Sequence, residues 1–366
     1  MNKLPQELLP LIIQHLEKQD DRYTCTLVDK RFYQAAIPLL WETADLFSNE
    51  PAQTFLTCLM TMSQHQPIGR HIRALSVNNC VWTDTEFLFV IEHTRWLEDL
   101  QLINLKHITD TSLQHLGRHC PRLQTLLLYH IDISQPSMDA LGQHCYQLTE
   151  LTLANCWKLG PDTFSAMIDG CPLEMLHIEY PSLGLITDKV AMDLTANHFD
   201  RLTELELMYL PIGFIERLLS AAATAAGSWP HLTHLTINNY DINYQDDGGD
   251  GALVPFLQTH PGLRVLDLNQ SQFNLKLLKA ISVIHHPKIM DLHLRCVRCL
   301  SDSGGGAAVL RQLVRDCPML GYISLDACMV PSSSFPEAGT ACISQRYHNM
   351  LQRLDQEAIT KIRLAS

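Results

Sequence analysis

One six-residue pattern, leucine-x-x-leucine-x-leucine, recurs along this chain and constrains its fold more than any other feature. Isoleucine or valine replaces leucine in some copies, and successive copies begin 25 to 31 residues apart. The ten copies begin at Ile72, Leu97, Leu123, Leu148, Leu173, Leu202, Leu232, Leu263, Ile289 and Leu320. Such a period indicates structural repeats that stack on one another. The length of 366 residues alone would suggest two or three domains, but stacked repeats grow by addition.

Each copy of the pattern predicts a short strand followed by a helix. Alternation along a strand sends the leucines to one face and the residues between them to the other. Several strands are followed by a helix-start signal such as Thr109-Asp110, and the helical stretch ends near a proline such as Pro121. No single repeat can bury its own leucines, so neighbouring repeats must complete the core.

Most of the twelve cysteines keep the same register as the leucines. Seven of them fall at fixed positions near the strands: Cys80, Cys120, Cys145, Cys156, Cys171, Cys317 and Cys328. We therefore expect buried, reduced thiols rather than disulfides. With cysteine at its ninth position, the pattern resembles the cysteine-containing subclass of leucine-rich repeats over residues 72–330. The resemblance implies an α/β solenoid of horseshoe form with about ten repeats, strands on the concave face and helices on the convex face.

Residues 4–41 do not follow the repeat and predict three short helices. The first helix carries one apolar stripe. Asp20 and Asp21 can cap the second helix, and the third is expected over Lys30 to Ile37, ended by Pro38. Three helices in about forty residues cannot bury all of their apolar side chains among themselves. Some of these side chains must face a partner or the neighbouring repeats.

The same segment resembles an F-box. Its L-P-x-E-L-L opening at Leu4, its L-V-x-K-x-F middle at Leu27 and its P-x-L-W ending at Pro38 match that family in order and spacing. The resemblance implies docking on the Skp-type adaptor of a Skp–cullin–F-box ubiquitin ligase, and through it on a cullin scaffold. The implied adaptor-binding residues are Leu4, Pro5, Leu8, Leu9, Ile12, Leu27, Val28, Phe32 and Trp41. A helical cap for the repeats is the alternative interpretation.

The predicted domain organisation has four parts. Residues 1–45 form the F-box-like unit, residues 46–71 a connecting helix that leads into the first repeat, and residues 72–330 the leucine-rich repeats. Residues 331–366 form a C-terminal helical cap, with a closing helix expected over residues 340–364.

Charge and hydropathy exclude several classes of protein. The net charge of −12 argues against a nucleic-acid binder, which needs basic clusters to neutralise phosphates. No apolar run approaches the roughly 20 residues of a membrane helix, and the N-terminus does not resemble a signal peptide. We therefore expect a soluble cytoplasmic or nuclear protein that binds neither nucleic acid nor membrane.

The sequence offers little for catalysis. It contains no P-loop, dinucleotide fingerprint or G-x-S-x-G motif. One dense group of potential metal ligands comprises His285, His286, His293, Cys296 and Cys299, but no second ligand pair follows at finger-like spacing. We expect no cofactor, no metal and no catalytic residue. An enzyme that uses this His/Cys group is a less favoured hypothesis.

Eight of the strand positions that point away from the leucine core carry acidic residues, whereas Arg295 is the one arginine or lysine there. Tyr180 and Tyr209 occupy the same slot of adjacent repeats. Aromatic residues beside charges are typical of protein-binding hot spots, although a solvated acidic face with incidental tyrosines is the alternative. The acidic positions are Asp99, Glu150, Glu179, Glu204, Glu206, Asp267, Asp291 and Asp326. The candidate target-binding residues are Glu179, Tyr180, Glu204, Glu206, Met208 and Tyr209, facing a protein with a basic or mixed surface.

Together the two resemblances favour a non-catalytic substrate-recognition subunit of a Skp–cullin–F-box ubiquitin ligase. The F-box would hold the adaptor, and the repeats would hold a target protein for ubiquitination. Such a subunit acts by placing target lysines near the activated ubiquitin. A ligase-independent leucine-rich-repeat scaffold or inhibitor that binds a protein partner is the alternative.

Overall fold

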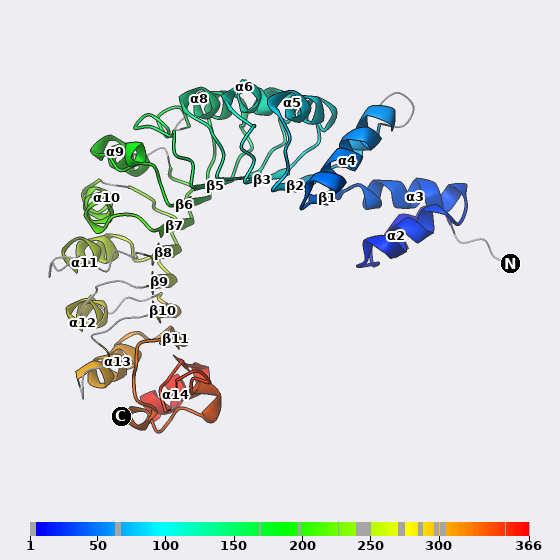
Figure 1. The fold of residues 1–366 in the computed structure, drawn as a ribbon. Coiled ribbons are helices and arrows are strands. Elements are labelled where there is room, and N and C mark those ends of the chain that lie inside the picture. Colours follow the sequence, from blue (N-terminus) through cyan, green and yellow to red (C-terminus); the bar gives the residue numbers. More distant parts are fainter. Residues whose placement is uncertain are drawn as a thin grey trace. The chain divides into compact units, whose positions relative to one another are not determined.

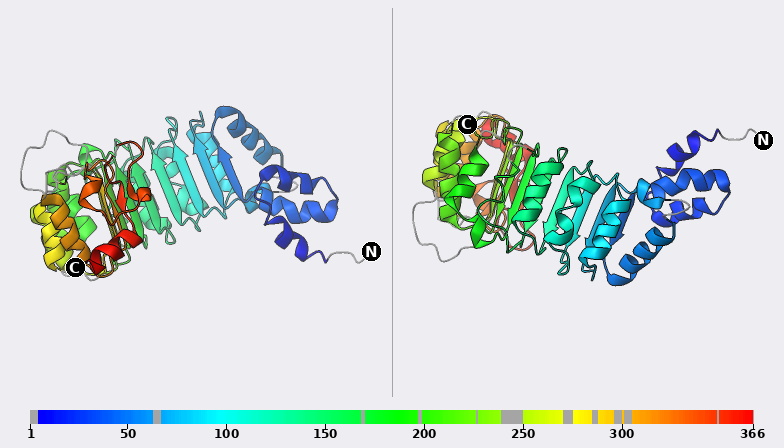
Figure 2. Two further views of the ribbon diagram at one scale, coloured as in Figure 1. Left: turned by 90° about the horizontal axis from the view of Figure 1, so that it is seen from below. Right: turned by 90° about the horizontal axis from the view of Figure 1, so that it is seen from above.

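The computed structural model describes residues 5–62, 67–167, 170–196, 199–225, 227–238, 250–269, 275–284, 288–295, 300, 305–347 and 349–365. The chain divides into two compact units, residues 1–172 and residues 173–366. In both units, a largely parallel sheet has helices along one face (Figures 1 and 2). We call the opposite, helix-free side of the strands the strand face.

The first unit begins with three helices, α1 (Leu8–Ile13), α2 (Gln19–Thr26) and α3 (Lys30–Leu40). The Asp29 side chain caps α3 by accepting hydrogen bonds from the backbone N–H groups of Arg31 and Phe32, at 2.7 and 2.9 Å. Pro38 does not end α3, as the sequence suggested, but lies inside its last turn. Proline has no N–H to donate to the carbonyl of Gln34, so it costs the helix one hydrogen bond, and α3 ends two residues beyond it.

The ten strands expected from the leucine pattern are all present, each beginning two residues after the start of its copy. The first unit contains β2 (Ala74–Asn78), β3 (Asp99–Ile103), β4 (Thr125–Tyr129) and β5 (Glu150–Ala154). They pair in parallel, so that Leu75, Leu100, Leu126 and Leu151 lie side by side. The second unit contains β6 (Met175–Glu179), β7 (Glu204–Met208), β8 (His234–Asn238), β9 (Val265–Asn269), β10 (Asp291–Arg295) and β11 (Tyr322–Ser324).

An additional strand, β1 (Thr43–Leu46), precedes the first leucine copy and pairs in parallel with β2. In this register Ala44 lies beside Leu75 and Leu46 beside Val77. Residues 41–46 therefore repeat the pattern with tryptophan and alanine in place of two leucines. These substitutions hid the strand from a search for leucine spacing.

The remaining helices lie between the strands. In the first unit they are α4 (Asn49–Met62), η1 (Ile68–His71), α5 (Asp84–His93), α6 (Asp110–Leu113), α7 (Leu116–His119) and α8 (Gln135–His144). In the second unit they are η2 (Leu183–Leu185), α9 (Asp188–Thr195), α10 (Ile212–Thr224), α11 (Asp250–Thr259), α12 (Leu275–Ile284), α13 (Gly305–Asp316), η4 (Ser332–Ser334), η5 (Thr340–Cys342) and α14 (Gln356–Leu364). A helix was expected over residues 161–167, but they form turns. Phe164 and Met167 are nevertheless buried.

The repeats stack through leucines and thiols. Each of the strands β2 to β10 points two leucine, isoleucine or valine side chains inward, and both are buried. The shorter β11 has one such residue, Ile323, which is also buried. The thiols of Cys80, Cys156 and Cys328 approach the carbonyl oxygens of Leu46, Leu128 and Leu294 in the preceding repeat, at 3.6, 3.5 and 3.0 Å. This slot suits a small side chain with a weak donor, which explains why cysteine keeps the register.

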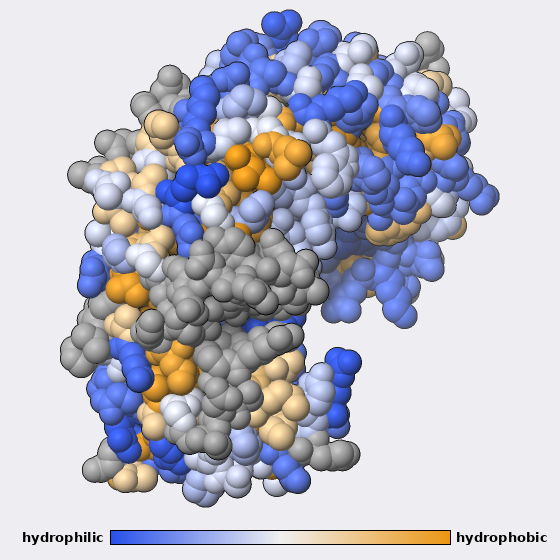
Figure 3. Space-filling view, turned by 60° about the vertical axis from the view of Figure 1, so that its left-hand side comes forward, coloured by the Kyte–Doolittle hydropathy of each residue, from blue (hydrophilic) through white to orange (hydrophobic). Residues whose placement is uncertain are grey.

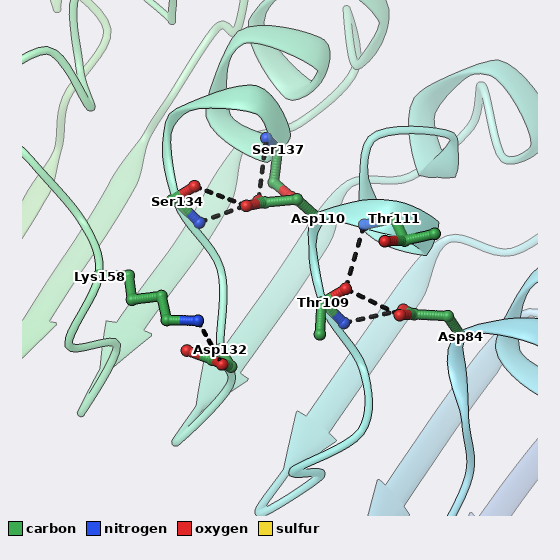
Figure 4. Close-up of polar contacts among 8 residues, drawn as sticks. All are labelled: Asp84, Thr109, Asp110, Thr111, Asp132, Ser134, Ser137 and Lys158. Atoms are coloured by element: carbon green, nitrogen blue, oxygen red, sulfur yellow. Dashed lines mark hydrogen bonds and ion pairs between the residues drawn. The ribbon is translucent and has the colours of Figure 1, made fainter.

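Carboxylates join the starts of neighbouring helices in the first unit (Figure 4). Asp84, at the start of α5, accepts hydrogen bonds from the N–H and hydroxyl of Thr109 and from the hydroxyl of Ser112. Asp110 accepts the same set from Ser134 and Ser137 in the next repeat. The sequence suggested that Asp110 caps its own helix, whereas its carboxylate binds the following one. We call these two contacts the aspartate staples.

The C-terminal segment differs from the expected closing helix over residues 340–364. The helix α14 begins only at Gln356, and β12 (Arg353–Leu354) pairs antiparallel with β11. Arg363 of α14 donates hydrogen bonds to the carbonyl oxygens of Val314, Cys317 and Leu320, at 2.7 to 3.0 Å. These contacts cover the last parallel strand and supply donors to carbonyls at the end of α13.

Hydrophilic residues cover most of the face in view in Figure 3, and apolar residues there gather in separate patches. Among the described residues, no helix is long and apolar enough to cross a membrane.

Candidate functional site

Apolar side chains are exposed at two places on the N-terminal helices. On α1, Leu8 and Ile12 are 41% and 49% exposed. After the end of α2, Leu27 and Val28 are 68% and 58% exposed. Leu11 and Tyr23 are also exposed, and the family pattern did not point to them. Of the other implied docking residues, Pro5 is exposed and Leu4 lies outside the described residues.

Three of the implied adaptor-binding residues lie elsewhere. Leu9 is 2% exposed and packs with Ile13 in the small core of the helical unit, so it supports the exposed face rather than forming it. Phe32 is partly buried against the same core. Trp41 lies at the junction with the repeats, where its ring centroid is 6.3 Å from that of Phe55 in α4. Adjacent residues of a helix point in different directions, so Leu9 faces the core while Leu8 faces outward.

On the strand face of the second unit, two tyrosines form a stack. The rings of Tyr180 and Tyr209 are parallel within 5°, with centroids 3.9 Å apart. Both residues directly follow a strand and have positive φ, 43° and 58°. Equivalent positions in the first unit carry residues such as Asn79 and Asn104, which tolerate this conformation better than a bulky aromatic residue does. Because the backbone disfavours tyrosine here, the stack is a candidate contact site for a partner.

Histidines beside the tyrosines contact the acidic side chains of the strand face. His177 Nδ1 is 2.8 Å from Glu206 Oε2, and His177 Nε2 is 3.7 Å from Glu179 Oε2. The hydrogen bond from His177 holds the pKa of Glu206 below its ordinary value despite partial burial. His234 Nδ1 lies 3.7 Å from Glu204 Oε1. Neither histidine stood out in the sequence, although His177 and Glu206 occupy the same slot of adjacent repeats.

Three polar atoms on this strand face are buried without a hydrogen-bond partner: His177 Nε2, Asn238 Oδ1 and Asp267 Oδ1. Burial raises the pKa of Asp267 more than His293 and Arg295 lower it. A buried polar atom without a partner costs about 1–3 kcal/mol.

No group of three or more potential metal ligands occurs among the described residues. Of the His/Cys group considered above, His285, His286, Cys296 and Cys299 lie outside the described part of the chain. His293 lies on β10, where its ring centroid is 5.5 Å from that of Tyr322.

The sequence matches no model of a known protein family. It also matches no curated protein. Among solved structures, the crystal structure of the Rad7 and Elc1 complex in yeast is similar to this chain with a TM-score of 0.48 and 15% sequence identity. The match covers 88% of this chain and 83% of that chain. A likeness of this size carries no argument about function.

Proposed function

We propose that this protein is the substrate-recognition subunit of a Skp–cullin–F-box ubiquitin ligase. Its N-terminal helices bind a Skp-type adaptor, and the strand face of its second unit binds a target protein. The observation that carries this proposal is the exposure of Leu8, Ile12, Leu27 and Val28 on a helical unit whose sequence has the F-box pattern. The protein contributes position rather than covalent chemistry, by holding target lysines near an enzyme that other subunits supply.

The exposed side chains need a partner for energetic reasons. Fully burying one leucine- or valine-sized side chain stabilises a complex by about 1.5–3 kcal/mol. Among the described residues of the helical unit, the core consists of four buried apolar residues, namely Leu9, Ile13, Ala35 and Ala36. Its exposed apolar side chains therefore offer more to an adaptor than they contribute to its own core.

The adaptor test uses the full chain and a purified Skp-type adaptor. The double variant Ile12→Asp/Val28→Asp places two charges on the exposed apolar positions, and we expect it to lose adaptor binding in calorimetry or pull-down. Both positions are exposed, so the thermal melt should stay close to that of the parent. Phe32 is avoided because its side chain packs against the core.

The matched control is Met192→Asp, which places a charge at a 64% exposed apolar position on α9 in the second unit. This variant should bind the adaptor like the parent. Absence of adaptor binding by the intact parent chain would overturn the proposal.

The target surface is tested separately by reversing charge on the strand face. In proximity labelling with intact chain, Glu179→Lys/Glu204→Lys should lose targets that the parent labels, because a basic partner then meets like charge. Asp200→Lys makes the same kind of change at an exposed position before β7 and should leave the labelled set unchanged. An unchanged set in the double variant would place target recognition elsewhere.

A further inference from the structure

Arginines gather along one edge of the first unit, in the turns that lead from each helix into the next strand. Arg70 and Arg95 stand four residues before β2 and β3, and Arg122 stands three residues before β4. Arg73 directly precedes β2, and Arg118 lies in the last turn of α7. The strands pair in sequence order, so these turns follow one another along the edge. We call these five arginines, with Trp96, the basic edge.

A tryptophan holds two of the guanidinium groups together. The guanidinium carbon of Arg122 lies 3.8 Å from the centroid of the Trp96 ring, and that of Arg73 lies 5.5 Å from the same ring. Trp96 itself is 39% exposed. Cation–π contact fixes both guanidiniums beside an apolar surface that a partner can cover.

Two further arginines donate to histidines instead of carboxylates. Arg118 Nε donates to His144 Nε2 at 3.0 Å, and Arg70 Nε donates to His71 Nε2 at 3.1 Å. An imidazole nitrogen that accepts a hydrogen bond is unprotonated, so each ring orients its arginine without neutralising it. Burial, followed by the charges of Arg70 and Arg73, holds the pKa of His71 below its ordinary value.

The positive charge of the basic edge is largely unpaired within the described residues. Arg73 makes an ion pair with Glu98 at 3.7 Å, whereas no ion pair joins the other four arginines to a described carboxylate. Backbone hydrogen bonds also join Arg73 to Glu42 and Glu98. In a chain of net charge −12, four exposed arginines free of carboxylates form a local site for an anion.

We infer that the basic edge binds a short acidic segment of a protein partner. Each guanidinium would donate two parallel hydrogen bonds to an Asp or Glu carboxylate of this segment. Trp96 would contact the apolar atoms of the segment. Neighbouring strands lie about 4.8 Å apart, so the turns before β2, β3 and β4 span about 10 Å, the length of three or four extended residues. A nucleic acid would extend beyond the edge and meet the acidic remainder of the chain.

The residues of the basic edge differ from those of both sites of the proposed function, although Arg70 lines a pocket with Tyr33 and Gln34 of α3, which also lie beside Leu27. The adaptor site lies on α1 and after α2, and the proposed target site lies in the second unit. The basic edge would therefore bind its acidic segment whether or not the chain joins a ligase. An acidic segment on the target, or on another subunit, would give the complex a second point of attachment.

The inference is tested by fluorescence anisotropy with the full chain. The probe is a fluorescein-labelled peptide of five consecutive glutamates, and the reference probe replaces them with five glutamines. We expect the glutamate peptide to bind at least about tenfold more tightly, and its affinity to fall as NaCl rises to about 0.5 M, because exposed charges are screened.

The key variant is Arg95→Gln/Arg118→Gln, which leaves the Trp96 contacts in place. It should weaken binding of the glutamate peptide by about tenfold or more. Arg201→Gln/Arg315→Gln removes two exposed arginines of the second unit, with the same change in net charge, and should bind like the parent. Circular dichroism melts confirm that both variants fold.

Three results would each overturn the inference. The first is equal binding of the glutamate and glutamine peptides. The second is an equal loss of binding in the two double variants, which would reflect net charge alone. The third is binding of a labelled ten-nucleotide uridine RNA as tightly as the glutamate peptide, which would assign the edge to nucleic acid instead.

Discussion

At the scale of single residues, the thiols show how strongly a repeat restricts one position. Burial raises the pKa of Cys120 and Cys171 to about 12 and that of Cys156 to about 11. A thiol with such a pKa is almost entirely protonated near neutral pH and is a poor nucleophile. The register of these cysteines in the sequence predicted their burial correctly, because a position that repeats with the leucines faces the same core.

We therefore expect slow alkylation of Cys120, Cys156 and Cys171 by iodoacetamide at pH 7.5 in the folded protein. The partly exposed Cys25 and Cys58 should react first. Peptide mass spectrometry over a time course measures each site separately, and a denatured sample gives the reference rate. Equal rates at Cys58 and Cys120 in the folded protein would contradict the assigned burial.

The staple formed by Asp110 is also a residue-scale feature, and it predicts a dependence on pH. Burial alone would raise the pKa of Asp110, but hydrogen bonds from Ser134 and Ser137 outweigh it and hold the pKa below its ordinary value. The unfolded chain therefore binds this proton more readily than the folded chain does. The stabilisation is fully present above the ordinary carboxyl pKa and is lost as pH falls through the lower folded value.

Asp110→Ala should lower the free energy of unfolding at pH 7 by about 1–3 kcal/mol, since it removes a charged acceptor from several hydrogen bonds. The difference between variant and parent should shrink as the pH falls toward 3. Urea titrations at several pH values measure this difference. Asp200→Ala, at an exposed position, is the control and should behave like the parent throughout.

At the scale of elements, the sequence predicted strands better than the segments between them. Strand positions are set by inward leucines that must meet the leucines of both neighbours, so the spacing locates each of the strands β2 to β11, although β11 ends two residues earlier in its copy than the others do. The strand β1 escaped because Trp41 and Ala44 fill the leucine positions. Residues 161–167 form a run of turns that buries Phe164 and Met167, as a helix would. The spacing of apolar residues therefore did not distinguish turns from a helix there.

The inward leucines should each make a large contribution to stability. Leu151 of β5 and Leu205 of β7 are fully buried, one in each unit. Replacement of either by alanine should lower the free energy of unfolding by about 2–5 kcal/mol, through lost burial and the cavity left behind. Chemical denaturation measures this change, and Thr152→Ala on the strand face of β5 serves as a control with little expected effect. A near-zero change for Leu151→Ala would contradict the register.

At the scale of the whole molecule, a single net charge concealed two surfaces of opposite sign. The acidic strand-face positions followed from alternation along each strand, so the sequence located Glu179, Glu204 and Glu206 correctly on it. The histidines that pair with them, and the arginines of the basic edge, were missed. Arg73 and Arg122 are 49 positions apart in sequence, and only the stacking of repeats places both beside Trp96.

Adaptor binding, as proposed, should stabilise the molecule by mass action. At an adaptor concentration of 100 times the dissociation constant, the gain is about 2.7 kcal/mol for the cooperative part of the chain that includes the helical unit. Thermal melts with increasing adaptor should shift upward for the parent and for Met192→Asp. The melt of Ile12→Asp/Val28→Asp should stay in place, and a shift of equal size there would argue against the proposed contact residues.

The aspartate staples give the row of repeats a direction. Asp84 and Asp110 each reach forward to a Thr or Ser at the next helix start and to a Ser three residues later. One repeat therefore supplies the carboxylate of each staple, and the next repeat supplies the hydroxyl groups that donate to it. Deleting the repeat that carries Thr109, Asp110 and Ser112 would leave Asp84 facing Ser134 and Ser137, which offer the same kind of donors, so this deletion should keep one staple intact. A grafted repeat whose helix start lacks these hydroxyls would instead leave the preceding carboxylate without donors, so a graft should be chosen by the Ser or Thr residues at its helix start.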